Sequence, residues 1–204
     1  MLTIVAMLSS DSIFFAPKHK PEAANAARQQ LAMPEGDHLT ILNVYKSFVE
    51  CRESKKQWCF DHYVNYRTMK KVLEVRKQLL EYFRQMPAVE QTAETEQLRR
   101  EWAAYLAPER VLRCIVAAFF MHVALRQPTG RYTTLKDNKE VYIHPTSSLF
   151  GKKPPCVVYN ELVLTSKNYI RDVSAININW LVEVAPRYFS RWRDANNTSN
   201  KTSQ

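Results

Sequence analysis

The stretch PTGRYTTLKDNKEVYIHP, residues 128–145, decides the fold of this chain. At its beginning the spacing of apolar residues changes from about 3.6 to 2, which marks a change from helix to strand. We predict strands over residues 132–135 and 141–143, joined by a hairpin turn around Asp137 and Asn138. The chain is therefore expected to be helical before this stretch and β-rich after it.

The segment that follows carries two further strands and a helix. Residues 145–155 are predicted to form a loop, and residues 157–164 form the longest β run of the chain. Residues 169–173 follow closely enough to pair with that run. An amphipathic helix over residues 179–185 is predicted before Pro186.

The preceding segment reads as a series of helices, which we expect over residues 2–9, 21–33 and 68–85, with a short aromatic helix around Trp58, Phe60 and Tyr63. The first of them begins without a capping side chain, so we expect the chain to start inside a longer domain. Asp37 is the predicted N-cap of a further helix. The predicted apolar faces are Leu39, Leu42, Tyr45, Phe48 and Val49; Met69, Val72, Leu73, Leu79, Leu80 and Phe83; and Leu112, Ile115, Val116, Phe119, Phe120 and Val123.

This order of elements predicts an α+β protein, because helices come first and strands afterwards instead of alternating. We expect two small units, with a charged helical insertion over residues 88–107 that ends at Pro108. Residues 191–204 are expected to form a disordered tail, because residues 196–204 contain no apolar side chain to bury.

The net charge of +9 favours an anionic partner, because clustered Lys and Arg attract phosphates. Charge alone leaves nucleic acid and a merely basic soluble protein equally open. The four cysteines form no CxxC pair, so they are expected to be thiols of a reducing compartment and no metal site is predicted. The most apolar stretch, residues 111–125, is too short to span a membrane, so no membrane partner is expected.

Glycine usage excludes a class of enzyme. Only Gly36, Gly130 and Gly151 occur, and each is isolated. A loop that wraps phosphates needs several glycines for positive φ and close backbone approach. We therefore expect that this chain alone is not an enzyme that hydrolyses nucleotides.

Several short segments are more specific than the composition. They are GDHLTILNVY (36–45), WC (58–59), NYRTM (65–69), VRKQL (75–79), IHPTS (143–147), VYNE (158–161), TSKNYIR (165–171), WL (180–181) and AP (185–186). In this order they resemble segments of the DEAH-box RNA helicases of the splicing and ribosome-assembly type. The resemblance runs from about residue 1 to residue 190.

The resemblance implies a domain organisation. Residues 1–107 would form a partial helical ratchet, or helicase-associated, domain with the insertion 88–107, and residues 108–190 an OB-fold domain with its leading helix. In that family both lie after two RecA-like motor domains and a winged helix. The chain has no Walker A lysine, DEAH box or arginine finger, so ATP and magnesium would serve the full-length parent and this chain would hold no cofactor.

The resemblance also implies partners. Single-stranded RNA would thread a channel between the motor and these two domains, and grip in such a channel is mostly to phosphate and sugar. Further partners would be the RecA-like and winged-helix domains of the parent, glycine-rich-patch activators and spliceosomal proteins. A nuclear location is implied in the same way.

Candidate RNA-binding residues occur in both halves. Asn65 and Arg67 stand at the head of the long helix, where they would contact phosphates; alternatively Asn65 caps that helix and Arg67 pairs with a carboxylate. The barrel candidates lie near the hairpin turn and after the longest strand, where OB barrels bind nucleic acid, and the alternative is a solvated basic edge. They are Lys136, Asn138, Lys167, Asn168 and Arg171.

Other polar residues are expected to be structural. His144 has no nucleophile and third orienting group beside it in the pattern, and Glu161 lies in the predicted buried run. Most of Tyr132, Tyr142, Tyr159 and Tyr169 are expected to be core. Three functions therefore stay open: a helicase accessory module, a free-standing OB-type RNA-binding protein, and a protein-interaction module.

Overall fold

The computed structural model describes residues 1–85 and 108–189, and these divide into two compact units. Residues 1–34 and 38–85 belong to the first unit, and residues 35–37 and 108–189 to the second. The predicted insertion 88–107 and tail 191–204 lie outside the described residues. No helix within the described residues is both long enough and apolar enough to cross a membrane.

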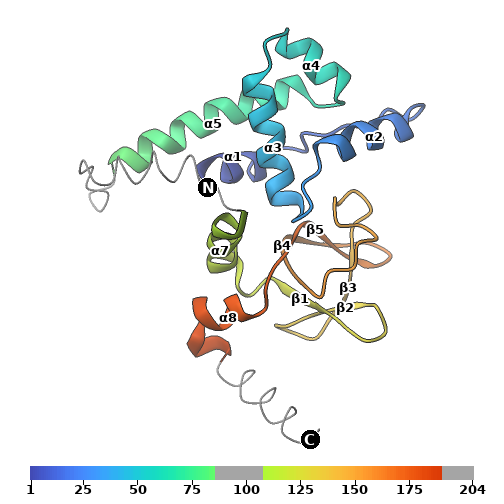
Figure 1. Ribbon diagram of the computed structural model, residues 1–204, viewed down its shortest axis with the longest axis vertical. Coiled ribbons are helices and arrows are strands. Elements are labelled where there is room, and N and C mark those ends of the chain that lie inside the picture. Colours follow the sequence, from blue (N-terminus) through green and yellow to red (C-terminus); the bar gives the residue numbers. More distant parts are fainter. Residues whose placement is uncertain (86–107, 190–204) are drawn as a thin grey trace, which may run out of the picture. The chain divides into compact units, whose positions relative to one another are not determined.

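The first unit is helical (Figure 1, blue to green). Its elements are α1 (Leu2–Leu8), α2 (Pro21–Leu31), α3 (Asp37–Glu50), α4 (Lys55–Asp61) and α5 (Tyr66–Gln85). Helix α1 packs on α5, whose Met69 and Val72 are fully buried, and Arg76 Nε donates a hydrogen bond of 2.9 Å to Thr3 Oγ1. Pro21 opens α2 at a position where a missing N–H is not needed.

The buried face of α3 differs from the predicted one. Ile41, Val44 and Phe48 are buried together with Leu39, whereas Val49 is 44% exposed. Leu42 and Tyr45 are half-buried. The prediction was wrong about this face because α3 has apolar residues on two adjacent stripes, and helical spacing alone does not choose between them.

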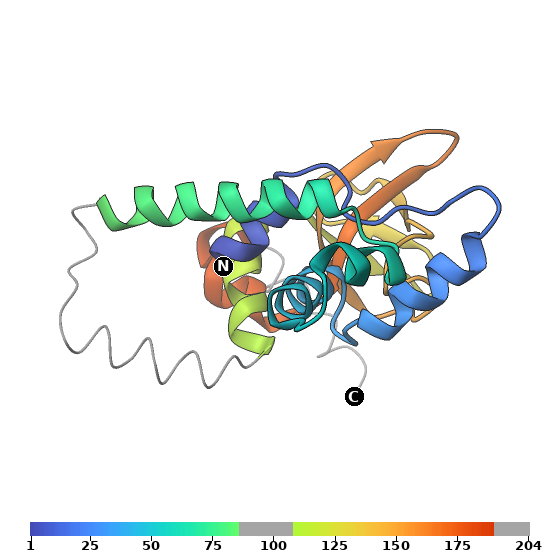
Figure 2. The ribbon, with the colours of Figure 1, turned by 90° about the horizontal axis from the view of Figure 1, so that it is seen from above.

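The second unit contains a closed five-stranded barrel. Its strands are β1 (Val123–Arg126), β2 (Tyr132–Thr134), β3 (Glu140–Ile143), β4 (Cys156–Leu164) and β5 (Asn168–Ala175), in the order β1-β2-β3-β5-β4. Neighbouring strands are antiparallel except β3 and β5, which run parallel. In Figure 2, β4 and β5 form the long orange hairpin. This strand order is the Greek-key arrangement of an OB fold, and the fold confirms the predicted α+β class.

The interior of the barrel is filled by apolar residues of its strands, which alternate along β3 but are three residues apart in β5. Val141 and Ile143 of β3 point inward, as do Val157 of β4 and Ile170 and Val173 of β5. The hairpin turn around Asp137 and Asn138 is present between β2 and β3. Strand β1 was missed, because Val123 continues the apolar run of the preceding helix, and a short apolar run does not distinguish strand from helix.

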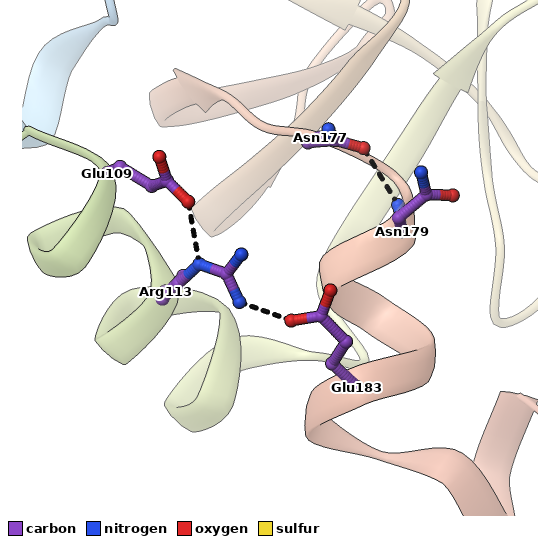
Figure 3. A network of polar contacts seen from close by, with 5 residues as sticks. All are labelled: Glu109, Arg113, Asn177, Asn179 and Glu183. Carbon is purple, nitrogen blue, oxygen red and sulfur yellow. Dashed lines mark hydrogen bonds and ion pairs between the residues drawn. The ribbon is translucent and has the colours of Figure 1, made fainter.

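Two helices flank the barrel within the second unit, α7 (Pro108–Phe119) and α8 (Asn179–Val184). Arg113 of α7 joins them: its Nε donates to Glu109 at 2.9 Å, and its Nη1 donates to Glu183 of α8 (Figure 3). Its guanidinium also lies 5.0 Å from the centre of the Trp180 ring. This network is exposed, so apolar burial of Ile115, Val116 and Leu181 contributes more to the packing of the two helices.

Residues 35–37 complete the barrel unit. Gly36 forms an isolated antiparallel bridge with Ser174, and Ala175 N donates 2.9 Å to Glu35 O. The buried Asp37 carboxylate accepts hydrogen bonds from Ser147 Oγ at 2.6 Å, Ser148 N at 2.7 Å and Val173 N at 2.9 Å.

The N-cap role of Asp37 stays a prediction beside these contacts to the barrel. Helix α3 begins at Asp37 itself, and the carboxylate serves the barrel. Gly36 has φ +126°, and a Cβ there would clash with the Val173 carbonyl oxygen and lie 2.6 Å from Ser174 Cα. Only glycine allows the chain to approach β5 this closely.

Candidate nucleic-acid interface

The parallel pairing of β3 and β5 creates an aromatic surface on the outside of the barrel. In register, Ile143 lies beside Ile170, and Tyr142 lies beside Tyr169. Since the two isoleucines are buried inside, the two tyrosines point outward, where both are half-buried. Their ring centres are 6.3 Å apart and the rings are inclined by 54°. We call Tyr142, Lys167 and Tyr169 the β3–β5 surface.

This finding corrects the expectation for the tyrosines. Tyr132 and Tyr159 are core residues, with 5% and 6% exposure, but Tyr142 and Tyr169 are not. Burial raises the pKa of Tyr132 to about 12, and its hydroxyl donates a hydrogen bond of 2.6 Å to Pro154 O.

Lys167 adds positive charge to the surface. Its Nζ lies 4.9 Å from the centre of the Tyr142 ring, which is cation–π distance. The side chain is exposed and has no salt bridge with any residue of 1–85 or 108–189. A hydrogen bond of 3.0 Å from Asn168 Nδ2 to Glu140 O ties the turn that carries Lys167 to β3. Asn168 thus has a structural role beside the surface.

The β2–β3 turn carries Lys136 and Asn138. Asp137 accepts a hydrogen bond from Thr134 Oγ1 and an ion pair of 3.1 Å from Lys139, and these two contacts lower the pKa of Asp137. Asn138 has φ 52°, a left-handed conformation that asparagine tolerates, and its N–H donates 3.1 Å to Thr134 O. Lys136 is exposed and forms no salt bridge with the described residues.

Paired and unpaired cations therefore alternate along this side of the barrel. Arg131 donates to Glu140 at 2.9 Å, and Tyr142 donates its hydroxyl proton to the same carboxylate. The hydrogen bond from Tyr142 and then that from Arg131 lower the pKa of Glu140, and the same bond raises the pKa of Tyr142. Arg131 and Lys139 are thus neutralised locally. Lys136 and Lys167 retain charge that an incoming anion can bind.

Arg171 and Glu161 form a register pair across β4 and β5. Arg171 is half-buried and Glu161 is exposed, so the expectation that Glu161 lies buried among barrel hydrogen bonds is wrong. Tyr159 lies in the barrel core, whereas Glu161 lies further along β4, on the part of the β4–β5 hairpin beyond the pairing with β1. Opposite charges at such a position stabilise the pairing of the two strands.

In the helical unit, Asn65 and Arg67 stand at the start of α5. Asn65 Oδ1 accepts hydrogen bonds from Arg67 N at 3.0 Å and Thr68 N at 3.2 Å, which is the geometry of an N-cap. The capping alternative for Asn65 is therefore present. Arg67 is exposed, and none of the described residues forms a salt bridge with it.

His144 is held by its neighbours. Its Nδ1 lies 2.7 Å from Thr146 Oγ1, and its ring meets Tyr169 edge to face at 5.4 Å. The described residues contain no group of three or more potential metal ligands among His, Cys, Asp and Glu. The side chains that the β3–β5 surface and the β2–β3 turn present to a ligand are therefore cations and aromatic rings.

Comparison with known proteins identifies the two units. Residues 111–188 match a family model described as oligonucleotide/oligosaccharide-binding (OB)-fold, and residues 1–41 match one described as helicase associated domain (HA2), ratchet-like. The human probable ATP-dependent RNA helicase DHX35 is 38% identical over 192 residues, covering 94% of this chain and 26% of that protein. The chain is similar over nearly its whole length to the accessory region of DEAH-box RNA helicases. This confirms the resemblance inferred from the short segments.

Two further DEAH-box relatives are named as splicing factors. The pre-mRNA-splicing factor ATP-dependent RNA helicase prp22 of Schizosaccharomyces pombe is 40% identical over 200 residues, which cover 98% of this chain and 16% of that protein. The pre-mRNA-splicing factor ATP-dependent RNA helicase DEAH10 of Arabidopsis thaliana is 38% identical over 202 residues, covering 93% of this chain and 27% of that protein. The chain thus corresponds to the accessory region of DEAH-box helicases and spans about a quarter or less of these relatives.

Proposed function

We propose that this chain is the RNA-binding accessory module of a DEAH-box helicase, and that it grips single-stranded RNA at the β3–β5 surface and the neighbouring β2–β3 turn. The observation that carries the proposal is the position of Lys136 and Lys167. Both are exposed and lack salt bridges with the described residues, whereas Arg131 and Lys139 beside them are paired.

The position of these lysines suits the fold. OB barrels bind oligonucleotides on the face of strands 2 and 3 and on the loops after strands 1 and 4. Lys167 lies in the β4–β5 turn, which is one of these loops, whereas Lys136 lies on the turn that joins strands 2 and 3. Contact through lysines to phosphates is independent of sequence and weakens with salt. An accessory module that holds any RNA during stepping needs this kind of contact.

The first turn of α5 would supply a second point of grip. Arg67 is exposed there, and the positive end of the helix dipole adds attraction for a phosphate. Asn65 would position this turn through its cap. Each unit would then have a contact of its own with RNA backbone.

ATP hydrolysis would belong to the rest of the parent protein. The three isolated glycines of this chain do not fit a phosphate-binding loop, and the described residues hold no metal-ligand cluster. ATP and magnesium would therefore act on RecA-like domains beyond this chain. The splicing names of two relatives support a nuclear location and spliceosomal partners for that parent. Glycine-rich-patch activators are proposed from the family resemblance alone.

A protein-interaction module is the second candidate. Leu164, at the end of β4, is 70% exposed, and Phe150, in the loop before β4, is 57% exposed. Apolar side chains at such positions are typical contacts of protein partners. The two candidates differ in whether the purified chain binds RNA.

Fluorescence anisotropy with the 204-residue chain tests the proposal. The probe is a labelled single-stranded RNA of about 12 nucleotides, within the site size of an OB fold. We expect affinity in the micromolar range at about 50 mM salt, falling steeply at about 200 mM. Absence of binding at low salt would overturn the proposal and favour the protein-interaction module. ATPase activity in a pure preparation would contradict the assignment of hydrolysis to other domains.

A further inference from the structure

The rings of Tyr142 and Tyr169 are held in fixed positions on the outside of the barrel. The Tyr142 hydroxyl donates to Glu140, and that carboxylate is itself held by Arg131. The Tyr169 ring meets the His144 ring edge to face. A side chain whose ring is fixed before binding loses little conformational freedom when a ligand arrives.

The surroundings of these rings distinguish them from an apolar docking patch. Lys167 lies over the Tyr142 ring, and Glu140 and Arg131 lie at its hydroxyl end. Both tyrosines are only partly exposed, so they present rings among charged groups instead of a continuous apolar area. Aromatic rings with adjacent cations are what unpaired nucleotides require, because a base stacks on the ring and its phosphate pairs with the cation.

We propose that Tyr142 and Tyr169 form a stacking platform for the unpaired bases of single-stranded RNA, with Lys167 contacting the adjoining phosphate. This inference rests on the proposed function and adds to it that bases are contacted as well as the backbone. Because every base has a π face, such a platform increases affinity without selecting a sequence. It also requires that the bases be unpaired.

The experiment compares two probes of equal length and charge, a single-stranded RNA and the same ribose-phosphate backbone without bases. The wild-type 204-residue chain is expected to bind the RNA about tenfold more tightly than the abasic probe. In the double variant Tyr142→Leu with Tyr169→Leu this preference is lost, while the abasic probe still binds in a salt-dependent manner. The double variant Tyr142→Phe with Tyr169→Phe keeps the preference because it keeps both rings.

Tyr82→Leu is the matched control, since Tyr82 is 68% exposed on α5 and outside the barrel unit. It should leave the preference unchanged. Equal wild-type affinity for both probes, with salt-sensitive binding intact, would overturn the platform and leave the proposed function standing. Binding to neither probe would overturn both.

Two further outcomes would also overturn the stacking platform. A preference that persists in a folded leucine variant would show that bases stack elsewhere and would overturn the platform. Loss of the preference in the phenylalanine variant would assign it to the hydroxyls instead of the rings. Circular dichroism melting monitors folding; if the leucine variant unfolds, the wild-type comparison and the phenylalanine variant still decide.

Discussion

The Nδ2 amide of Asn168 donates a hydrogen bond of 3.0 Å to the main-chain oxygen of Glu140. This bond fixes the β4–β5 turn against β3 and so sets the position of Lys167 over the Tyr142 ring. Asn168→Ala should lower the free energy of unfolding by about 1 kcal/mol, the net value of such a bond. Urea unfolding measures this change. An Asn168→Ala chain as stable as wild type would show that the turn is held by other contacts.

Removing unpaired lysines should have a larger effect on RNA binding than removing paired cations. We expect Lys136→Ala with Lys167→Ala to lower the slope of log affinity against log salt by about 0.7 for each lost phosphate contact. The matched control is Arg131→Ala with Lys139→Ala, which removes equal charge from ion-paired positions. Anisotropy titrations at several salt concentrations compare the two. Equal slopes in both double variants would assign the effect to net charge alone.

The two residues at the start of α5, Asn65 and Arg67, should differ in their effects on stability and on RNA binding. Arg67→Ala is expected to weaken RNA binding without changing stability, because Arg67 is exposed. Asn65→Ala should cost about 1 kcal/mol of stability through loss of the cap, whereas Asn65→Ser retains a capping oxygen and should cost less. Thermal melts and RNA titrations of the three variants test this. If Asn65→Ser binds RNA as wild type does, the cap is the whole role of Asn65.

The buried Asp37 carboxylate should be essential for the barrel. Asp37→Ala leaves two main-chain N–H groups and the Ser147 hydroxyl without their acceptor, so we expect a loss of about 3 kcal/mol or more in the free energy of unfolding. Asp11→Ala is the control, since the Asp11 side chain is 89% exposed. Urea unfolding measures both variants. A loss below that of one ordinary hydrogen bond would contradict the role assigned to Asp37.

Alkaline pH should destabilise the barrel through Cys156. Burial raises the pKa of this thiol to about 12 from its ordinary value of 9.0. Above pH 9 the unfolded chain loses the proton that the folded chain keeps, so stability falls as pH rises, by at most about 1.4 kcal/mol per pH unit. Cys156→Ala should show a shallower decline between about pH 9 and 10 in urea unfolding, and the same pH dependence as wild type below it. Parallel curves in that range would show that Cys156 ionises without opening the barrel.

The predictions of secondary structure were correct where residue propensity and the spacing of apolar residues indicated the same element. The turn at Asp137 and Asn138 and the longest strand followed from local propensity and alternation, and both are present. Strand β1 was missed because nothing in an apolar run distinguishes the end of a helix from a four-residue strand. The α3 face was wrong because two stripes were apolar, and tertiary packing made the choice.

The candidate site shows the same division. The lysines could be named from charge and turn position, but which of them are ion-paired depends on contacts between strands. The outward direction of Tyr142 was available from alternation, since Val141 and Ile143 flank it. That of Tyr169 was not, because strict alternation places Tyr169 on the same side as Val173, which lies in the core. The partners of Asp37 are 110 to 136 residues away along the chain, beyond the reach of any local pattern.

The attachment of residues 35–37 to β5 has a practical consequence for dissecting the protein. A recombinant fragment starting at Pro108 would keep every strand of the barrel but lose the carboxylate that accepts from Ser148 and Val173. Supplying a short synthetic peptide that contains Glu35, Gly36 and Asp37 would then be a form of complementation. A fragment that starts at Pro108 thus lacks residues 35–37 of the barrel unit. Weak RNA binding by this fragment would say nothing about RNA binding by the intact chain.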